Sequence, residues 1–150
     1  GDTFQLNLDP GHQTGQAHLE TVHADYARRG LDADLRPFIA DMAAEFAQAD
    51  LVICRAGAIT VSELCAAGSA SVLVPLVVST TAHQRDNAEY MERASAAIHL
   101  PQARLTPESL ADLLGRTSRN DCLRLAVEAR SLARPQAAAR VADAIEELLK

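Results

Sequence analysis

The stretch ADLVICRAGAITVSELCAAG, residues 49 to 68, decides the fold of this chain. Its apolar run Leu51 to Cys54 is rich in β-branched residues, which is typical of a parallel strand covered on both faces. Three residues then turn the chain, and a helical pattern runs from Ala58 to Leu64. Free backbone N–H groups at such a helix start can hold a phosphate, although the same unit also occurs in α/β domains without a ligand there.

Length and composition predict one globular domain, residues 1 to 150, without a nucleic-acid partner. Hydrophobic residues make up 48% and charged residues 23% of the chain, which is enough for a buried core. The net charge is −6, whereas binding to nucleic-acid phosphates needs clustered Lys and Arg. The longest apolar run, Ala70 to Val78, is too short for a membrane span and contains Pro75.

The sequence predicts neither a metal nor a redox cofactor. Cys54, Cys65 and Cys122 lack metal-like spacing, and buried free thiols are favoured over disulfides, which suits a reducing cytoplasm. Neither a G-x-G-x-x-G fingerprint nor a P-loop occurs, so NAD binding is disfavoured and a P-loop nucleotidase is excluded. No DxD-like metal motif is present, and helix dipoles with side chains are expected to replace a divalent cation.

Strand and helix patterns alternate along the chain, which predicts an α/β fold with a doubly wound, Rossmann-like parallel sheet and a ligand at the carboxyl ends of its strands. The predicted strands are residues 3–8, 31–35, 51–54, 71–76 and 96–99. The predicted helices are 17–29, one from Phe38, 58–64, one that follows the loop segment VVSTTAHQRDNA (77–88), one capped by Thr106 and Pro107, 121–132 and 135–150. The last helix carries an apolar stripe at Val141, Ala144, Ile145 and Leu148, which predicts packing in the core or against another domain.

Four segments occur in one order with suitable gaps, namely HQTG (12–15), PFIADM (37–42), ADLVICRAGAITVSEL (49–64) and HQRDNA (83–88). Together they resemble the donor-binding half of the MurG family, bacterial glycosyltransferases that add N-acetylglucosamine (GlcNAc) to lipid I in peptidoglycan synthesis. The resemblance runs from about His12 to the C-terminus. It implies the C-terminal half of a GT-B glycosyltransferase that binds UDP-GlcNAc.

The resemblance assigns the uridine end of the donor to the first segments. It implies that Thr14 lies near the donor phosphates, that the backbone of Ile39 faces the uracil edge, and that Phe38 and Met42 wall the base. Backbone N–H and C=O groups can match the uracil imide. Without the resemblance, PFIADM indicates only a strand-to-helix connection.

The turn Asp9-Pro10-Gly11 before HQTG departs from the family's usual run of a strand into this motif. His12 and Gln13 are therefore equally well interpreted as turn residues or as ligands.

The central segment is expected to hold the ribose and the diphosphate. Glu63 can accept hydrogen bonds from both ribose hydroxyls, and the alternative is a charge that complements the helix start. Backbone groups of Ala58, Ile59 and Thr60 are expected to bind the diphosphate and to stabilise the departing UDP. Arg55 would add positive charge near the leaving group, unless it only pairs with an acid.

The resemblance places His83 and Gln84 near the donor GlcNAc and phosphates, and Asn87 is expected to orient the loop or the sugar. By itself, His83 would be a solvent-facing residue at a helix start.

We expect the isolated chain to bind UDP-GlcNAc but to transfer little or no sugar. The resemblance implies an N-terminal domain, absent from this chain, that carries the lipid I site, the membrane-facing surface and the general base. The start at Gly1 suggests an artificial boundary. The full-length protein would be cytoplasmic and peripheral on the inner membrane. Two alternatives are a non-catalytic nucleotide-sugar binding module and a related transferase with another sugar or acceptor.

Overall fold

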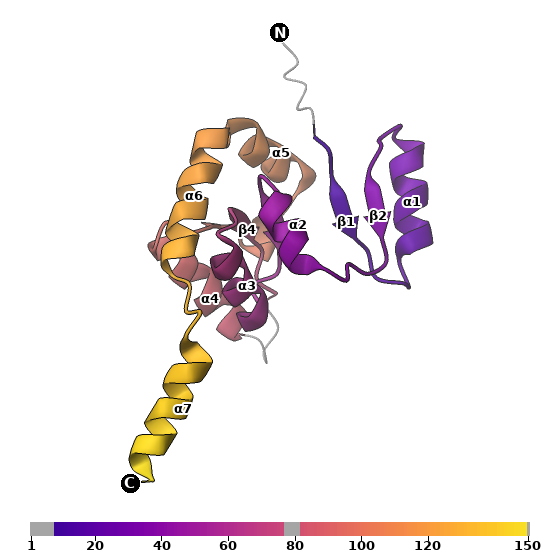
Figure 1. The fold of residues 1–150 in the computed structure, drawn as a ribbon. Coiled ribbons are helices and arrows are strands. Elements are labelled where there is room, and N and C mark those ends of the chain that lie inside the picture. The colour runs from indigo at the N-terminus through magenta and orange to yellow at the C-terminus, as the bar shows by residue number, and fades with distance from the viewer. Residues whose placement is uncertain (1–7, 77–81, 150) are drawn as a thin grey trace. The chain divides into compact units, whose positions relative to one another are not determined.

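The structure is a computed structural model that describes residues 8–76 and 82–149 (Figure 1). Helices and strands alternate, which confirms the predicted α/β fold with parallel sheets. The chain divides into two compact units, residues 1–42 and 43–150. The elements are, in chain order, β1 (Gly11–Gln13), α1 (Leu19–Arg28), β2 (Asp34–Arg36), α2 (Met42–Gln48), β3 (Val52–Cys54), α3 (Ala58–Ala67), β4 (Ser71–Leu73), α4 (Ala82–Arg93), β5 (Ile98–His99), the short 3-10 helix η1 (Gln102–Arg104), α5 (Pro107–Arg116), α6 (Arg119–Ser131) and α7 (Ala137–Leu148).

In the first unit, β1 and β2 form a parallel pair joined by the crossover helix α1. His12 lies opposite Leu35, and the N–H of Thr14 continues the ladder by donating to the Arg36 carbonyl at 2.9 Å. The interpretation of His12 and Gln13 as turn residues is therefore wrong, because their backbone belongs to a strand. The strand expected at residues 3–8 lies outside the described residues except for Leu8, which is not in a strand.

In the second unit, three parallel strands form a sheet in the order β3-β4-β5. The central strand β4 is fully buried. The prediction that the strand at residues 51–54 is central and covered on both faces is wrong, because β3 stands at one end of the order and Ile53 is 45% exposed. Val72 and Val74 pack with Leu100 and with Leu113 of α5 in one core cluster. Successive strand residues point to opposite faces, so the equally buried Leu73 lies on the other face of the sheet.

The connection from α3 to β4 depends on a glycine. Gly68 ends α3 with a left-handed φ of +70°, and its N–H donates to the carbonyls of Leu64 and Cys65. A Cβ at this position would lie 3.2 Å from Cβ of Arg130 in α6. The chain then enters β4 through Ser69, whose buried hydroxyl donates to the Phe46 carbonyl at 2.7 Å.

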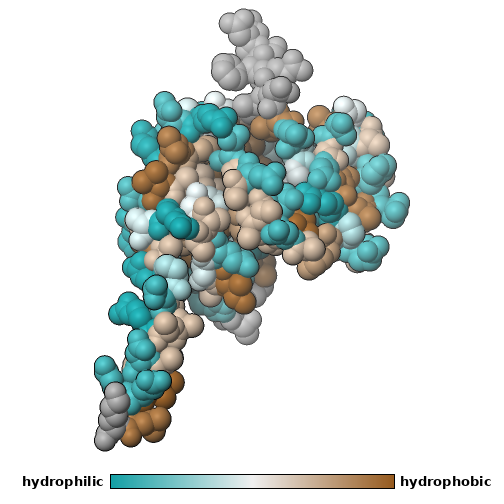
Figure 2. Space-filling view, viewed as in Figure 1, coloured by the Kyte–Doolittle hydropathy of each residue, from teal (hydrophilic) through white to brown (hydrophobic). Residues whose placement is uncertain are grey.

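The structure contradicts the predicted start of one helix and the predicted core packing of another. No helix begins at Phe38: α2 begins at Met42, and the Ile39 N–H donates to the Gln13 side chain at 3.0 Å. The stripe on α7 does not pack in the core, because Val141, Ile145 and Leu148 are more than half exposed. Apolar surface is visible at the C-terminal end of α7 (Figure 2).

Candidate functional site

The turn after β3 ends in an open helix start. Gly57 is the N-cap of α3, with φ −64° and ψ 147°, and a glycine offers no side chain to the N–H groups of the first turn. Ala56 is fully buried, and its carbonyl accepts a hydrogen bond from Nδ2 of Asn87 at 3.0 Å. The backbone that leads into α3 is therefore fixed from the α4 side while the helix start can bind an anion.

The Arg55 side chain, which follows β3, contacts the segments that follow β4 and β5. Its Nη1 donates to the carbonyl of Val74 at 3.1 Å and also to Oε1 of Gln102 in η1. Both acceptors are neutral oxygens, unlike the acid that the alternative interpretation of Arg55 requires. The guanidinium is exposed at the carboxyl edge of the β3-β4-β5 sheet.

The first turns of α4 carry two amide side chains that bond to backbone. Oε1 of Gln84 accepts from the Leu76 N–H at 3.0 Å, and Asn87 holds the Ala56 carbonyl. The Asn87 contact fixes the turn before α3, whereas its expected action on its own loop or on the sugar stays a prediction. His83 is exposed, as its position at a helix start predicts.

Three residues predicted to bind the donor border one cavity of about 720 Å³ beside α3. Ile59 is 77% exposed, and Ala58 and Glu63 are also exposed. Thr60 is half-buried and does not line the cavity. The cavity is lined by Ala58, Ile59, Val61, Ser62, Glu63, Cys65, Ala66, Tyr90, Leu132, Arg134, Pro135 and Ala137.

The residues expected to meet the base belong to the first unit. Phe38 is 74% exposed, Met42 is half-buried, and Ile39 is buried with its N–H bonded to Gln13. A uracil edge would therefore meet the Ile39 carbonyl or displace the Gln13 amide. The hydroxyl of Thr14 donates to the Gly15 carbonyl at 3.0 Å and to the Arg36 carbonyl at 3.4 Å, so a phosphate would compete with these backbone contacts.

Gln13 and Gln102 hold the backbone or side chains of predicted site residues. The sequence leaves Gln13 open as a turn residue or a ligand, and it does not single out Gln102. Gln13 is bound to a residue 26 positions away, and Gln102 to one 47 positions away. No local pattern marks such partners, because the contact exists only once separate strands are aligned.

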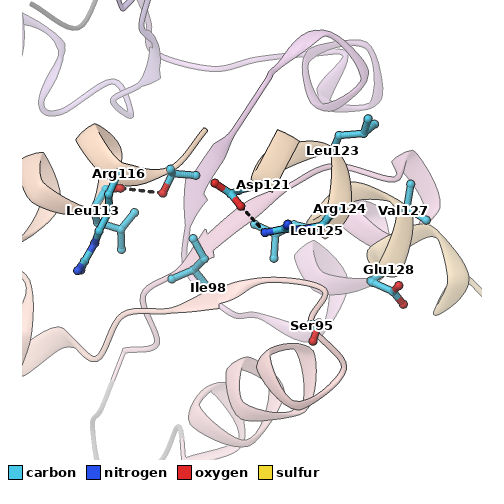
Figure 3. A pocket seen from close by; sticks show the side chains of 11 residues that line it. Ser95, Ile98, Leu113, Arg116, Asp121, Leu123, Arg124, Leu125, Val127 and Glu128 are labelled. Atoms are coloured by element: carbon cyan, nitrogen blue, oxygen red, sulfur yellow. Dashed lines mark hydrogen bonds and ion pairs between the residues drawn. The ribbon is translucent and has the colours of Figure 1, made fainter. Parts of the chain in front are cut away.

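A larger cavity of about 880 Å³ lies elsewhere in the second unit, between α5, α6 and the chain around Ser95 and Ile98 (Figure 3). Its wall contains the ion pair of Asp121 with Arg124, both on α6. Hydrogen bonds from the Ser118 hydroxyl and N–H hold the pKa of Asp121 below its ordinary value. None of the predicted donor-binding residues lines this cavity, so its volume alone does not make it the site.

The three cysteines are free thiols. Burial was expected from the predicted strand and helix positions of Cys54 and Cys65. Cys65 is buried, whereas Cys54 is only partly buried, as is Cys122. Burial still raises the pKa of Cys54 to about 11. Within the described residues, no cluster of His, Cys, Asp and Glu could hold a metal ion, and no helix is long and apolar enough to cross a membrane.

This architecture, with parallel strands, crossover helices and an open helix start at a strand's carboxyl end, is that of a Rossmann-like α/β ligand-binding domain. The family model of the glycosyltransferase family 28 C-terminal domain matches residues 5–148. The chain therefore belongs to this family, and the resemblance to MurG is confirmed.

Its relatives include N-acetylglucosamine transferases from several bacteria. A UDP-N-acetylglucosamine–N-acetylmuramyl-(pentapeptide) pyrophosphoryl-undecaprenol N-acetylglucosamine transferase of Methylibium petroleiphilum is 60% identical over 93% of this chain and 38% of its own length. The enzyme of that name from Chromobacterium violaceum is 58% identical over 91% of this chain and 39% of its own length. The crystal structure of Acinetobacter baumannii MurG superposes with a TM-score of 0.86 at 40% identity, over 93% of this chain and 41% of that one. The chain thus spans about two fifths of the length of these relatives.

Proposed function

We propose that this chain is the donor-binding part of a glycosyltransferase that moves GlcNAc from UDP-GlcNAc to lipid I, forming lipid II. The relatives are named as transferases of this sugar to an undecaprenol-linked muramyl acceptor. The observation that carries the proposal is the open start of α3, capped by a glycine and followed one turn later by the exposed carboxylate of Glu63.

In this proposal the diphosphate binds the N–H groups of Ala58, Ile59 and Thr60. Negative charge grows on UDP as its bond to the sugar breaks, and the positive end of the α3 dipole stabilises that charge. Because the dipole is already oriented, this stabilisation costs no reorganisation in the transition state. Arg55 adds a positive charge at the same edge of the sheet, on the β3 side of the turn.

Glu63 would accept hydrogen bonds from the ribose hydroxyls. It lies four residues beyond Ile59, which is about 6 Å along a helix axis. A ribose attached to a diphosphate at the helix start can reach this carboxylate. Ile59 and Glu63 border the same cavity, which supports the binding of one ligand by both residues.

The base and the sugar would use the remaining predicted residues. Phe38, Ile39 and Met42 would contact the uracil and Thr14 a phosphate, while His83 and Gln84 would meet the GlcNAc and phosphates. Asn87 would orient its loop or the sugar, in addition to fixing the turn before α3 through the Ala56 carbonyl.

Transfer itself would need parts that this chain does not supply. A preceding N-terminal domain would carry the lipid I site, the general base and the membrane-facing surface. The complete protein would be peripheral on the cytoplasmic face of the inner membrane. The chain by itself is expected to bind the donor without transferring its sugar.

The test is titration of the ¹⁵N-labelled chain with UDP-GlcNAc, with UDP, ADP, NAD and UDP-glucose as comparison ligands. We expect uridine-selective shifts at Ala58 to Glu63. Glu63→Ala should weaken binding by at least about tenfold, because hydrogen bonds to a charged group are lost. The matched control is Glu146→Ala, an exposed glutamate on α7.

Equal affinity for ADP and UDP, or a Glu63→Ala variant that binds as tightly as the parent chain, would contradict the proposal. UDP-glucose binding as strong as UDP-GlcNAc binding would instead favour a transferase of another sugar.

A further inference from the structure

The side chain of one arginine links the segments that follow the three parallel strands of the second unit. Arg55 follows β3, and its Nη1 donates to the carbonyl of Val74, just beyond β4. The same nitrogen donates to Oε1 of Gln102, in η1 beyond β5. One guanidinium therefore joins the carboxyl ends of the whole sheet.

Arg55 also stands directly before the turn proposed to hold the diphosphate. The next residue, Ala56, is fully buried and its carbonyl is bound by Asn87 of α4. Two side-chain contacts therefore hold the chain at this turn: Asn87 binds the Ala56 carbonyl, and Arg55, the residue before it, binds the segments after β4 and β5. Only Ala56 and Gly57 separate Arg55 from the first residue of α3, so the direction of the helix start depends on how Arg55 is held.

We propose that Gln102 is a positioning residue of the donor site and acts through Arg55. The inference rests on the proposed function, since it concerns the same site. An amide oxygen orients the guanidinium without neutralising it, whereas a carboxylate would orient it and offset its charge. Glutamine at position 102 therefore fixes the turn and leaves Arg55 fully positive beside the developing charge on UDP.

Two substitutions separate these roles. Gln102→Leu removes the acceptor, so the guanidinium is released and the turn loosens. Gln102→Glu keeps an acceptor, so the turn stays fixed while the charge of Arg55 is offset. Gln48→Leu, at the exposed last residue of α2, is the matched control for loss of a glutamine.

The first readout needs no ligand. In spectra of the ¹⁵N-labelled chain, Gln102→Leu is expected to shift the Arg55 Nε–H signal and the amide signals of Gly57 and Ala58. Gln102→Glu should keep the amide signals of Gly57 and Ala58 near their parent positions, and Gln48→Leu should leave all three signals unchanged. A Gln102→Leu spectrum identical to that of the parent chain in these signals overturns the proposal.

The second readout is affinity for UDP-GlcNAc. Gln102→Leu should weaken binding about twofold to tenfold, the range expected for one hydrogen bond, and the loss should not depend on salt. Gln102→Glu should also weaken binding, with a loss that shrinks as added salt screens the new charge. Parent-like affinity in both variants overturns the proposal.

The two proposals fail in different ways. A parent chain that does not prefer uridine nucleotides contradicts the proposed function, and the ligand-free spectra still decide whether Gln102 holds the turn. A parent chain that binds UDP-GlcNAc, with both variants unchanged, leaves the function standing and removes Gln102 from it.

Discussion

Side chains at the carboxyl edge of the second sheet act mainly on backbone. Gln84 accepts from the Leu76 N–H, Asn87 donates to the Ala56 carbonyl, and Arg55 donates to the Val74 carbonyl. Each contact fixes a segment that follows a strand. A donor would therefore meet a site whose backbone is already oriented, which reduces the ordering cost of binding.

Cys54, at the end of β3, is predicted to resist alkylation in the folded chain. Burial raises the pKa of its thiol to about 11, so only about one molecule in a thousand carries the reactive thiolate at pH 8. Mass spectrometry after iodoacetamide treatment should show slow modification of Cys54 in buffer and rapid modification in urea. Equal rates in both solutions would mean that Cys54 is not shielded by the fold.

The residues of the candidate site could be proposed from the sequence because they fall in short contiguous motifs. The hydrogen-bond partners of these residues could not be predicted from the sequence. The sequence marks Arg55 as a cation after a strand, but its acceptors, Val74 and Gln102, come from segments that only the aligned sheet brings together. The same holds for the Ile39 N–H, which is bound by Gln13.

At the scale of elements, helix starts with local caps were predictable. Thr106 and Pro107 begin α5 as the sequence predicts, and Thr106 forms a capping box with Ser109. The start of α6 was placed two residues late at Asp121, because that residue is the acidic partner within the capping box and Ser118 is the cap. The helix expected at Phe38 was wrong because residues 37–41 are bends and irregular backbone, in which the Ile39 N–H donates to the Gln13 side chain instead of to a helical carbonyl.

Ser118→Ala is predicted to lower the free energy of unfolding by about 1 kcal/mol at neutral pH. The Ser118 hydroxyl and N–H hold the pKa of Asp121 below its ordinary value, so this carboxylate stabilises the folded state above its unfolded pKa. The contribution is lost as the pH falls through the lower, folded pKa. The difference between Ser118→Ala and the parent chain should therefore shrink in acid.

Urea unfolding at neutral and acidic pH measures this difference. The matched control is Ser131→Ala at the other end of α6, where the hydroxyl donates to the backbone carbonyl of Glu128. A loss in Ser118→Ala that is equal at both pH values would show that Asp121 takes no part in the cap's stabilisation.

At the scale of the whole molecule, the order of strands and helices was predictable from alternating patterns, and the parallel pairing of β1 with β2 and of β3, β4 and β5 agrees with it. The apolar stripe of α7 was harder to interpret. Periodicity shows that a helix has an apolar face but does not show what covers it. In the structure that face is exposed, so the predicted packing against another domain remains a prediction.

Ile145→Ser on α7 tests this interpretation. Because Ile145 is exposed, its replacement should change the free energy of unfolding of this chain by less than about 0.5 kcal/mol. Leu73→Ala, at a fully buried position of β4, should cost about 2–5 kcal/mol and serves as the comparison. In a chain that also carries the proposed N-terminal domain, Ile145→Ser should become destabilising, because the stripe would then lose a buried contact. A large loss in the present chain would instead show that α7 packs on the second unit in solution.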